Sequence, residues 1–540
     1  MSPRDVLVRR PILITPVQKL SIGIIDIVSK GPTRALYARL MNANLASIMP
    51  QVIGVWCRQQ GHDITFVCYT GFEDLLQELP DRLDVLFICA FTEAAHTAYA
   101  LSNLFRARGA ITVLGGPHAR CYPEDAVNYF DYVLGFTDRE TLLGVLQDCS
   151  HHRPAGVQLS SARQPLTLPG VQERWEFIEP TLNKTPALKM VPMVGSLGCP
   201  YTCAFCIDAD VPYQPMDFDQ LREDLAFLRT QFRRPLVAWH DPNFGVRFDD
   251  YLDMIEEAVP PGSIDFAAES SLSLLSEPHL KRLMHNGFKA LLPGIESWFD
   301  LGGKSKTGTS QGMAKVRQVS EHVNLILKYI PYVQTNFVLG LDSDEGEEPF
   351  ELTKRFLDLT PGAFPAYSLL TAFGRAAALN LDYQRENRVL PFPFHFLNNN
   401  QAMNVKPRNY SWRLFYDHVI ELTRYSFDAR RIVRRFFATQ GITSRWLNFV
   451  RAVSTEGNGR LKYYNDIRAR LDTDAQFSPY FEQESDELPE FYSDMVRKDL
   501  GTLWSCLPPG GLNHDPYSYS KSERSPTHLL NSPPQSLVQL

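Results

Sequence analysis

The sequence predicts an α/β protein with a doubly wound parallel sheet at the N-terminus, then a partial (β/α)6 barrel and a helical C-terminal region. Three observations favour this fold. Short apolar segments rich in β-branched residues alternate with helix-length segments over residues 1–150. A second alternation of strands and helices covers residues 191–395. Helical periodicity without strands follows in residues 396–507.

The composition is typical of a soluble globular protein. Of the 540 residues, 44% are hydrophobic and 21% are charged, and the formal net charge is -7. This acidic balance argues against a large nucleic-acid-binding surface. No apolar run approaches the roughly 20 residues of a transmembrane segment, and the N-terminus lacks the apolar core of a secretory signal. We therefore expect a cytoplasmic protein.

In the first domain, residues 1–150, the apolar segments indicate strands that are buried on both faces. The expected strands are 11–16, 63–70, 84–91, 110–115 and 132–136. The expected helices are 33–60, 72–79, 94–108, 123–129 and 138–148. A sheet of this kind binds its ligands beyond the carboxyl ends of the strands.

Two of these strand ends carry candidate binding residues. Thr92 follows the third strand, and Gly115, Gly116 and His118 follow the fourth. Paired glycines allow the backbone to approach a bulky ligand closely, but they are equally typical of a tight strand-to-helix turn. A single histidine is more often a turn residue than a ligand. The residues alone leave both interpretations open.

The segments outside the two α/β domains carry less chemistry. Residues 151–190 lack an apolar period and are rich in Pro, Gln and Ser, so we expect an extended linker. In the helical region, residues 428–435 (DARRIVRR) form a basic helix face. Solvation is its ordinary role, and contact with an anionic substrate or a membrane surface is the alternative. Residues 508–540 are expected to be a disordered tail.

The barrel domain begins with the most informative stretch of the chain. Its expected strands are 191–196, 236–240, 263–268, 288–295, 332–341 and 367–371. Cys199, Cys203 and Cys206 follow the first strand, with three and then two residues between them. Three thiolates at this spacing hold three irons of a 4Fe-4S cluster and leave the fourth iron open to a small molecule. The loop lies at a strand end, where barrel enzymes place their chemistry.

A zinc site is the alternative for the three cysteines. Closed zinc sites take four ligands, however, and no further Cys or His pair lies nearby at a suitable spacing. The other cysteines stand alone at irregular distances and are expected to be buried thiols. They are Cys57, Cys68, Cys89, Cys121, Cys149 and Cys506.

The form Cys-Pro-Tyr-x-Cys-x-Phe-Cys resembles the signature of the radical SAM superfamily. Together with residues 112–134 it resembles the branch that has an N-terminal cobalamin-binding domain, and the resemblance covers residues 1 to about 395. Two departures concern the first domain. The Asp-x-His-x-x-Gly signature of classical cobalamin proteins is absent, and residues 135–140 (GFTDRE) replace the usual Gly-Glu-Gly-Glu.

The resemblance implies a mechanism and a set of cofactors. The three cysteines would act as catalytic metal ligands of a 4Fe-4S cluster, and Phe205 would shield that cluster. S-Adenosyl-L-methionine would chelate the open iron, and one electron would split it to give a 5'-deoxyadenosyl radical. Such a radical needs an enclosed, dry site. Cobalamin would bind to the N-terminal domain through Thr92, Gly115, Gly116 and His118.

Further strand ends match the same branch. Gly294, Glu296 and Ser297 belong to a stretch that looks like the one whose polar residues contact the adenosylmethionine in relatives, and Glu269 resembles a polar position that neighbours this cofactor. Asp241 and Asn243 resemble another such position, but an Asx turn or a helix cap explains them equally well. His240 either lines the substrate cavity or caps its strand. The glycine-rich residues 302–308 lack the full Walker spacing, so they indicate nucleotide hydrolysis only weakly.

We predict a cobalamin-dependent radical SAM C-methyltransferase that acts on an unactivated carbon. One alternative keeps the radical chemistry but ends in a cyclisation, rearrangement or epimerisation. Another is a non-catalytic protein with a structural metal. A methylthiotransferase acting on RNA is disfavoured, since a second cluster pattern is absent and the charge is acidic. The expected partners are a small-molecule or lipid-like substrate and an electron donor such as flavodoxin or ferredoxin, without nucleic acid; the sequence does not specify the substrate.

Overall fold

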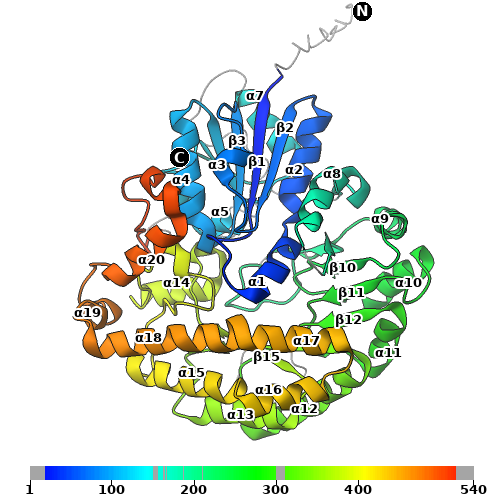
Figure 1. Ribbon diagram of the computed structural model, residues 1–540, viewed down its shortest axis with the longest axis vertical. Helices are drawn as coiled ribbons and strands as arrows, with labels where there is room; N and C mark the ends of the chain where they lie inside the picture. Colours follow the sequence, from blue (N-terminus) through cyan, green and yellow to red (C-terminus); the bar gives the residue numbers. More distant parts are fainter. Residues whose placement is uncertain are drawn as a thin grey trace, which may run out of the picture.

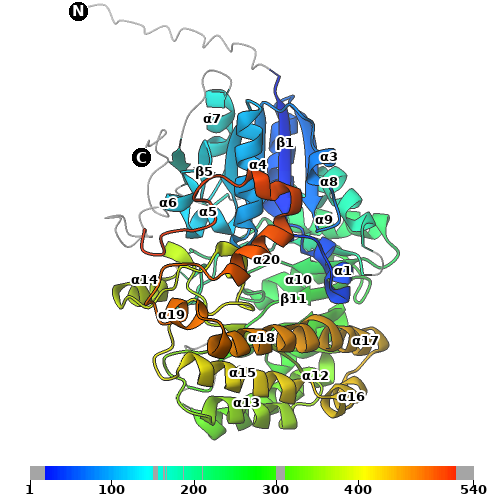
Figure 2. The ribbon, with the colours of Figure 1, turned by 60° about the vertical axis from the view of Figure 1, so that its left-hand side comes forward.

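The computed structural model describes residues 19–149, 156–161, 164–165, 167–185, 188–209, 211–299 and 310–518. Two parallel sheets are arranged one above the other, and a layer of C-terminal helices lies beneath the second sheet (Figures 1 and 2). The carboxyl ends of the N-terminal strands point toward the barrel. The predicted fold class is confirmed.

The N-terminal sheet has six parallel strands in the order β2-β1-β3-β4-β5-β6. Their bounds are β1 Ser21–Ile27, β2 Asp63–Tyr69, β3 Val85–Ala90, β4 Ile111–Gly115, β5 Tyr132–Leu134 and β6 Val157–Leu159. Alternate residues of β1 face opposite sides. Ile22 and Ile24 belong to one hydrophobic cluster, and Ile25 and Ile27 belong to another. Helices cover both faces, as expected of a doubly wound sheet.

The helices of this domain are mostly short. They are α1 Leu36–Met41, α2 Ile48–Gln59, α3 Leu75–Glu78, α4 Ala95–Ala107, α5 Pro117–Cys121, α6 Pro123–Ala126 and α7 Arg139–Cys149. The expected single helix over residues 33–60 is therefore wrong, because a 3-10 segment at Asn42–Leu45 separates α1 from α2.

The first strand differs from the prediction. The expected strand at residues 11–16 lies outside the described residues, and β1 was missed because Gly23 and Asp26 interrupt its apolar run. Both residues have structural reasons. A Cβ atom on Gly23 would lie 2.6 Å from Leu83 Cδ1, and the buried Asp26 accepts a hydrogen bond of 2.6 Å from the Ser47 backbone N–H. Buried polar groups require such partners.

The connector is also more ordered than expected. Residues 157–159 form β6, which pairs with β5 and completes the first sheet. Helix α8 spans Val171–Asn183, and the Glu173 side chain in its first turn accepts from the N-cap Gly170 backbone N–H at 3.0 Å. The prediction of an extended linker is wrong for these segments, because one strand and one short helix give only weak periodic signals.

The second sheet is a partial barrel of parallel strands. Its strands are β7 Met190–Met193, β10 Leu236–Trp239, β11 Asp265–Ala268, β12 Phe288–Leu291, β13 Gly294–Glu296, β14 Tyr332–Leu339 and β15 Phe364–Leu369. β12 and β13 both pair with β14 and replace the single strand expected over residues 288–295. The outer helices are α9 Phe218–Gln231, α10 Phe248–Ala258, α11 Glu277–Asn286, α12 Gly312–Tyr329 and α13 Glu348–Leu359.

The C-terminal region forms a helical layer and then returns to the first domain. After α14 (Ala378–Arg385), its elements are α15 Trp412–Ser426, α16 Ala429–Ala438, α17 Ile442–Arg451, a π-helix at Ala452–Gly459, α18 Arg460–Thr473, α19 Phe477–Phe481 and α20 Glu490–Leu500. A 3-10 turn at Gly501–Cys506 packs on α4, where Asn103 donates to the Cys506 carbonyl at 3.0 Å.

The expected disordered tail is wrong for its first part. His514 is buried, and its ring stacks on Phe394 with centroids 4.1 Å apart. Residues 519–540 lie outside the described residues. Among the helices that the structure describes, none is long and apolar enough to cross a membrane.

Candidate active site

A cavity of about 770 Å³ lies between the two sheets. Residues of the N-terminal sheet form one wall, among them Ile24, Phe87, Cys89, Gly115, Gly116 and Gly135. Residues of the barrel form the other wall, among them Ser196, Gly198, Trp239, His240, Asp241 and Glu269. Most of these residues stand at or just beyond the carboxyl ends of strands, whereas Ile24 and Phe87 lie within β1 and β3. The volume is at the upper end of ligand sites in proteins, so the cavity accommodates a large cofactor or two ligands side by side.

The strand order explains why the cavity lies at this place. β1 has β2 on one side and β3 on the other, so the winding of the sheet reverses between β1 and β3. Such a reversal opens a crevice beyond the strand ends, where α/β sheets bind their ligands. Gly116 turns the chain here with φ +89°, and a Cβ atom on it would lie 2.9 Å from Cys89 Sγ. Gly115 faces open space, because nothing lies within 4 Å of its Cβ position. The loop therefore needs Gly116 for its backbone conformation, and Gly115 leaves space beside the cavity.

The cysteine loop borders the barrel side of the cavity. It runs from β8 (Ser196–Leu197) to β9 (Gln214–Pro215), which pair with each other and close its base. Cys199 and Cys203 are buried and Cys206 is half-buried. The Asp208 backbone N–H donates to Cys206 Sγ at 3.4 Å, a contact that stabilises sulfur in its charged, metal-binding form.

The loop is held from several directions. Arg120 of α5 donates to Asp208 Oδ1 at 2.9 Å and to the Ile207 carbonyl at 2.7 Å. The Leu379 backbone N–H donates to the Ala204 carbonyl at 3.0 Å, and the Tyr201 hydroxyl lies 3.1 Å from Ser273 Oγ. The first of these contacts joins the N-terminal domain directly to the residues that follow Cys206. Relative motion of the domains would therefore disturb the loop.

Asp241 fixes the start of the cysteine loop. Its carboxylate accepts from the Gly195 backbone N–H at 2.8 Å and from Ser196 Oγ at 2.6 Å. Burial raises the pKa of Asp241 to about 6, and the hydrogen bonds from Ser196 and Gly195 oppose this rise. The neighbouring His240 is accessible from the cavity but enclosed by protein, and desolvation lowers its pKa to about 4. Of the two interpretations of His240, the structure favours lining of the cavity.

The predicted acidic residues lie in two places. Glu269 lines the cavity and is exposed to it. Glu296 ends β13 and is not a lining residue, but its backbone has φ +65°, a left-handed conformation that is uncommon outside glycine. A Cβ atom on Gly294 would clash with Glu296 Oε1, so the carboxylate folds back over that glycine. Strained backbone of this kind occurs most often at functional positions.

Besides Glu296, three more predicted cofactor-binding residues with buried side chains are absent from the cavity lining. His118 is fully buried, its Nε2 lies 2.8 Å from the Tyr99 hydroxyl and its ring packs edge-on against Phe394. Burial lowers the pKa of His118 to about 3, so the ring is neutral. The structure corrects its assignment from ligand to core residue. Thr92 is buried beneath the cavity wall that Phe91 and Glu93 form. Ser297 accepts from the Phe299 backbone N–H at 3.1 Å and serves a local turn.

The remaining predicted residues lie outside the cavity lining. Phe205 is half-buried within the cysteine loop, consistent with a place beside the thiols. Asn243 accepts from the backbone and side chain of Ser271, at 2.9 and 3.1 Å, which supports its interpretation as a turn residue. The glycine-rich residues 302–308 lie outside the described residues.

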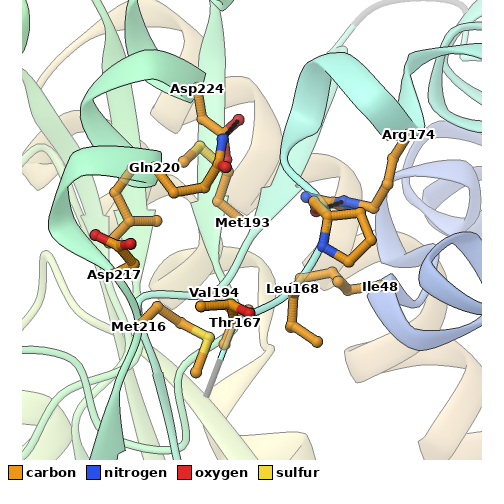
Figure 3. A pocket seen from close by; sticks show the side chains of 12 residues that line it. Ile48, Thr167, Leu168, Arg174, Met193, Val194, Met216, Asp217, Gln220 and Asp224 are labelled. Carbon is orange, nitrogen blue, oxygen red and sulfur yellow. Dashed lines mark hydrogen bonds between the residues drawn. The ribbon is translucent and has the colours of Figure 1, made fainter. Parts of the chain in front are cut away.

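A second chamber of about 60 Å³ adjoins the main cavity (Figure 3). Arg174 and Asp224 line it from opposite sides. Arg174 donates to Gln51 Oε1 at 2.7 Å, and Asp224 accepts from the Val171 backbone N–H at 2.7 Å. The volume is that of about two water molecules. These contacts join α2, α8 and α9, so we interpret the chamber as a structural junction.

The site residues fit an iron-sulfur cluster beside a large organic cofactor. No group of His, Cys, Asp or Glu in the described part of the chain converges on a single metal ion. A four-iron cube is larger than one ion, so its three cysteines need not meet at one point. The buried Trp239 Nε1 lacks a hydrogen-bond partner, and Trp239 lines the cavity. It is available as a donor to a polar ligand atom.

Sequence reasoning missed several residues that build this site. Arg120, Asp208 and Glu93 line the cavity, and Glu93 lies 3.6 Å from the ammonium group of Lys30. Arg120 and Asp208 stand close to sequence features that we singled out, the glycine pair and the cysteine loop. Their pairing over 88 residues of sequence follows from domain packing, which no local pattern reports.

Comparison with known proteins finds two curated relatives. The bacteriochlorophyllide d C-12(1)-methyltransferase of Chlorobaculum tepidum is 23% identical over 398 residues, which cover 72% of this chain and 83% of the relative. The bacteriochlorophyllide d C-8(2)-methyltransferase of the same organism is 22% identical over 309 residues, or 54% of this chain and 66% of that protein. No family model matches the chain.

Solved structures share the architecture over most of the chain. The radical S-adenosylmethionine methyltransferase TsrM from Kitasatospora setae, solved with cobalamin and a [4Fe-4S] cluster, has a TM-score of 0.52 and 13% identity. The match covers 89% of this chain and 99% of TsrM. The cobalamin-dependent S-adenosylmethionine radical enzyme OxsB, solved with aqua-cobalamin, has a TM-score of 0.53 and 12% identity, covering 95% and 84%. At these identities the likeness concerns the fold.

Proposed function

We propose that this chain, a radical SAM enzyme of the branch with an N-terminal cobalamin-binding domain, is a cobalamin-dependent C-methyltransferase. The single observation that carries the proposal is the cavity that the two sheets share. Its barrel wall adjoins a three-cysteine loop, and its other wall is a sheet crevice lined by glycines and apolar side chains. One chamber thus has a place for a radical generator and a place for a methyl carrier.

The cysteines would hold the cluster, and the neighbouring residues would set its surroundings. Cys199, Cys203 and Cys206 supply the thiolates, and the Asp208 backbone N–H reduces the negative charge on the third sulfur. When bound, the cluster supplies an electron for cleavage of S-adenosylmethionine and cobalamin carries the methyl group. Glu269 offers a carboxylate to the amino or hydroxyl groups of the adenosylmethionine, and Trp239 offers an N–H donor.

The N-terminal wall would hold the cobalamin mainly through shape. Gly115 leaves room beside the strand ends, Gly116 permits the tight turn that follows, and Ile24, Phe87 and Phe136 give an apolar surface that excludes water. Exclusion of water protects a reactive carbon radical from quenching. Because the buried ring of His118 contacts Tyr99 and Phe394, the proposal does not assign this histidine to cobalt.

For the substrate we propose only a chemical class. The names of the two relatives say that they act on bacteriochlorophyllide d. The wide, largely apolar cavity suits a small, extended organic molecule. We also propose that a reduced flavodoxin or ferredoxin supplies the electron. The exposed face beside the cysteine loop is where such a donor would have to approach.

Cofactor loading tests the proposal against its alternatives. The full chain is reconstituted anaerobically with iron, sulfide and cobalamin, and desalted. We expect stoichiometric cobalamin absorbance together with cleavage of added S-adenosylmethionine. Cleavage without retained cobalamin would contradict methyl transfer and favour a cyclisation, rearrangement or epimerisation. Four-ligand zinc without any cleavage would contradict the radical chemistry altogether.

A further inference from the structure

Apart from Leu414 of α15, the exposed large apolar side chains in the described C-terminal region gather on two consecutive helices. α16 exposes Val433 and Phe437, and α17 exposes Ile442, Trp446 and Phe449. The exposed fractions are 70% for Phe437 and 53% for Trp446, which are unusual for aromatic side chains. Figure 2 places both helices at the outer edge of the helical layer, far from the N-terminal sheet.

These side chains form one surface. On α17 the three exposed residues are spaced four and three apart, which places them on one helix face. Phe436 joins the two helices, because its ring lies 5.6 Å from that of Phe437 and 5.5 Å from that of Trp446. An exposed, continuous aromatic surface marks an interaction site more often than scattered apolar residues do.

The surface is also cationic. Arg430 and Arg434 are exposed and share the face of α16 that carries Val433 and Phe437. Neither helix contains Asp or Glu, although the chain as a whole has a net charge of -7. Arg431 is paired with Asp428 at 2.6 Å and Arg435 is buried. Arg434 is exposed and donates to the Asp358 backbone carbonyl at 3.1 Å, a contact that does not neutralise its charge, so Arg430 and Arg434 give this face its positive charge.

We propose that α16 and α17 bind the protein to the surface of an anionic lipid bilayer. Aromatic and aliphatic side chains enter the interface while arginines on the same face meet the phosphate groups. Each helix has 10 residues, about 15 Å, which is half the thickness of the hydrocarbon core. The helices therefore lie on the bilayer and do not cross it.

The charges favour a bilayer over a second copy of the chain. In a two-fold symmetric dimer through this surface, the same patch meets itself. Arg430 and Arg434 of both copies would then be buried close together on helices that have no acidic residue. Like charges in contact across an interface are costly. An anionic bilayer satisfies the arginines and the apolar side chains together.

Vesicle flotation with the full chain tests the proposal. The probes are vesicles of phosphatidylcholine and phosphatidylglycerol in equal parts, and of phosphatidylcholine alone. We expect binding to the first, with little binding to the second and a loss at high salt. Arg430→Gln lowers the partition coefficient about fivefold, since a basic residue near an anionic membrane contributes about that factor. The double variant Phe437→Ser and Trp446→Ser abolishes binding.

Controls separate this surface from general stickiness. Arg229→Gln with Arg233→Gln, exposed on the barrel side, and the exposed Met284→Ser leave the partition coefficient unchanged. Brominated lipids quench Trp fluorescence in the wild type, and Trp446→Phe loses that quenching while it retains binding. Absence of flotation at low salt would overturn the proposal. Vesicle binding that persists in the double variant would also overturn the proposal. The same holds if sedimentation shows a dimer of the wild type that the double variant converts to monomers.

Discussion

At the residue scale, the proposed cluster depends on three cysteines and on the side chains that position their loop. The spacing of the three cysteines predicts a cluster, because cluster ligation imposes a local pattern, and this role stays a prediction. The residues that hold the cysteine loop were not predicted in that role, since Arg120, Asp241 and Ser273 reach the loop from other elements. For His118, the position beside the glycine pair suggested a cofactor contact. The sequence gave no sign that its ring packs against Phe394.

Removal of one cysteine tests the cluster assignment. We expect Cys203→Ala to lose nearly all cluster absorbance after reconstitution and to form no measurable 5'-deoxyadenosine, because two thiolates cannot hold the cube with an open fourth iron. The matched control is Cys506→Ala, which removes a lone thiol outside the cavity. A Cys203→Ala protein that still yields 5'-deoxyadenosine would refute the assignment.

Arg120 tests the connection between the domains. We expect Arg120→Ala to keep its iron content but to cleave S-adenosylmethionine about tenfold more slowly, since it loses two hydrogen bonds to the cysteine loop. Arg120→Lys recovers the rate only partly, because an ammonium group cannot span both acceptors. The electron paramagnetic resonance spectrum of the reduced cluster with S-adenosylmethionine broadens in Arg120→Ala. The exposed Arg82→Ala is the control, and equal rates in both variants would contradict a positioning role.

At the element scale, the strand-to-helix loops place the site. The alternation of strands and helices predicted both sheets, because buried parallel strands read as apolar runs. It missed β1, whose run is broken by the buried Asp26, and α8, which lies in a stretch rich in Pro and Gln. Such elements depend on partners elsewhere in the fold, which local propensity does not report.

The loop after β4 gives a test at this scale. Gly115→Leu places a side chain in the cavity without a backbone clash, since nothing lies within 4 Å of the Cβ position. We expect at least tenfold weaker retention of cobalamin with an unchanged cluster. Gly144→Leu is matched, because its Cβ position in α7 is equally open but lies outside the cavity. Unchanged cobalamin retention in Gly115→Leu would show that this wall is not the binding surface.

At the scale of the whole molecule, the C-terminal segments lock the two α/β domains together. His118 of the N-terminal domain, Phe394 after the barrel and His514 near the end of the described chain pack as neighbours. His395 also lies there, with Nε2 3.1 Å from Asp499. Burial lowers the pKa of His118 and His514 to about 3 and that of His395 to about 4. This contact region is therefore built from neutral imidazoles.

The neutral histidines make stability dependent on pH. In the unfolded chain they take up protons below their ordinary pKa of about 6.5, whereas the folded protein resists protonation down to about pH 3 to 4. As the pH falls through this window, each histidine thus lowers the free energy of unfolding by on the order of 1 kcal/mol per pH unit. Buried aspartates with raised pKa values act in the opposite direction, namely Asp26, Asp125, Asp224 and Asp241.

A variant isolates the histidine contribution. His514→Phe keeps a ring against Phe394 but cannot take up a proton. We expect its unfolding free energy, measured by urea denaturation, to fall less than that of the wild type between pH 6.5 and pH 5. Identical pH slopes for the two proteins would contradict the role of His514.

The central claim is that a radical generator and a methyl carrier share one cavity between the two sheets. The most direct measurement is mass spectrometry of the products formed from S-adenosylmethionine by the anaerobically reconstituted, cobalamin-loaded protein under reducing conditions. The account predicts 5'-deoxyadenosine and S-adenosylhomocysteine together, because radical formation and methyl transfer each consume one molecule of S-adenosylmethionine. Formation of 5'-deoxyadenosine alone would contradict methyl transfer, and formation of neither product would contradict the assignment of the cavity.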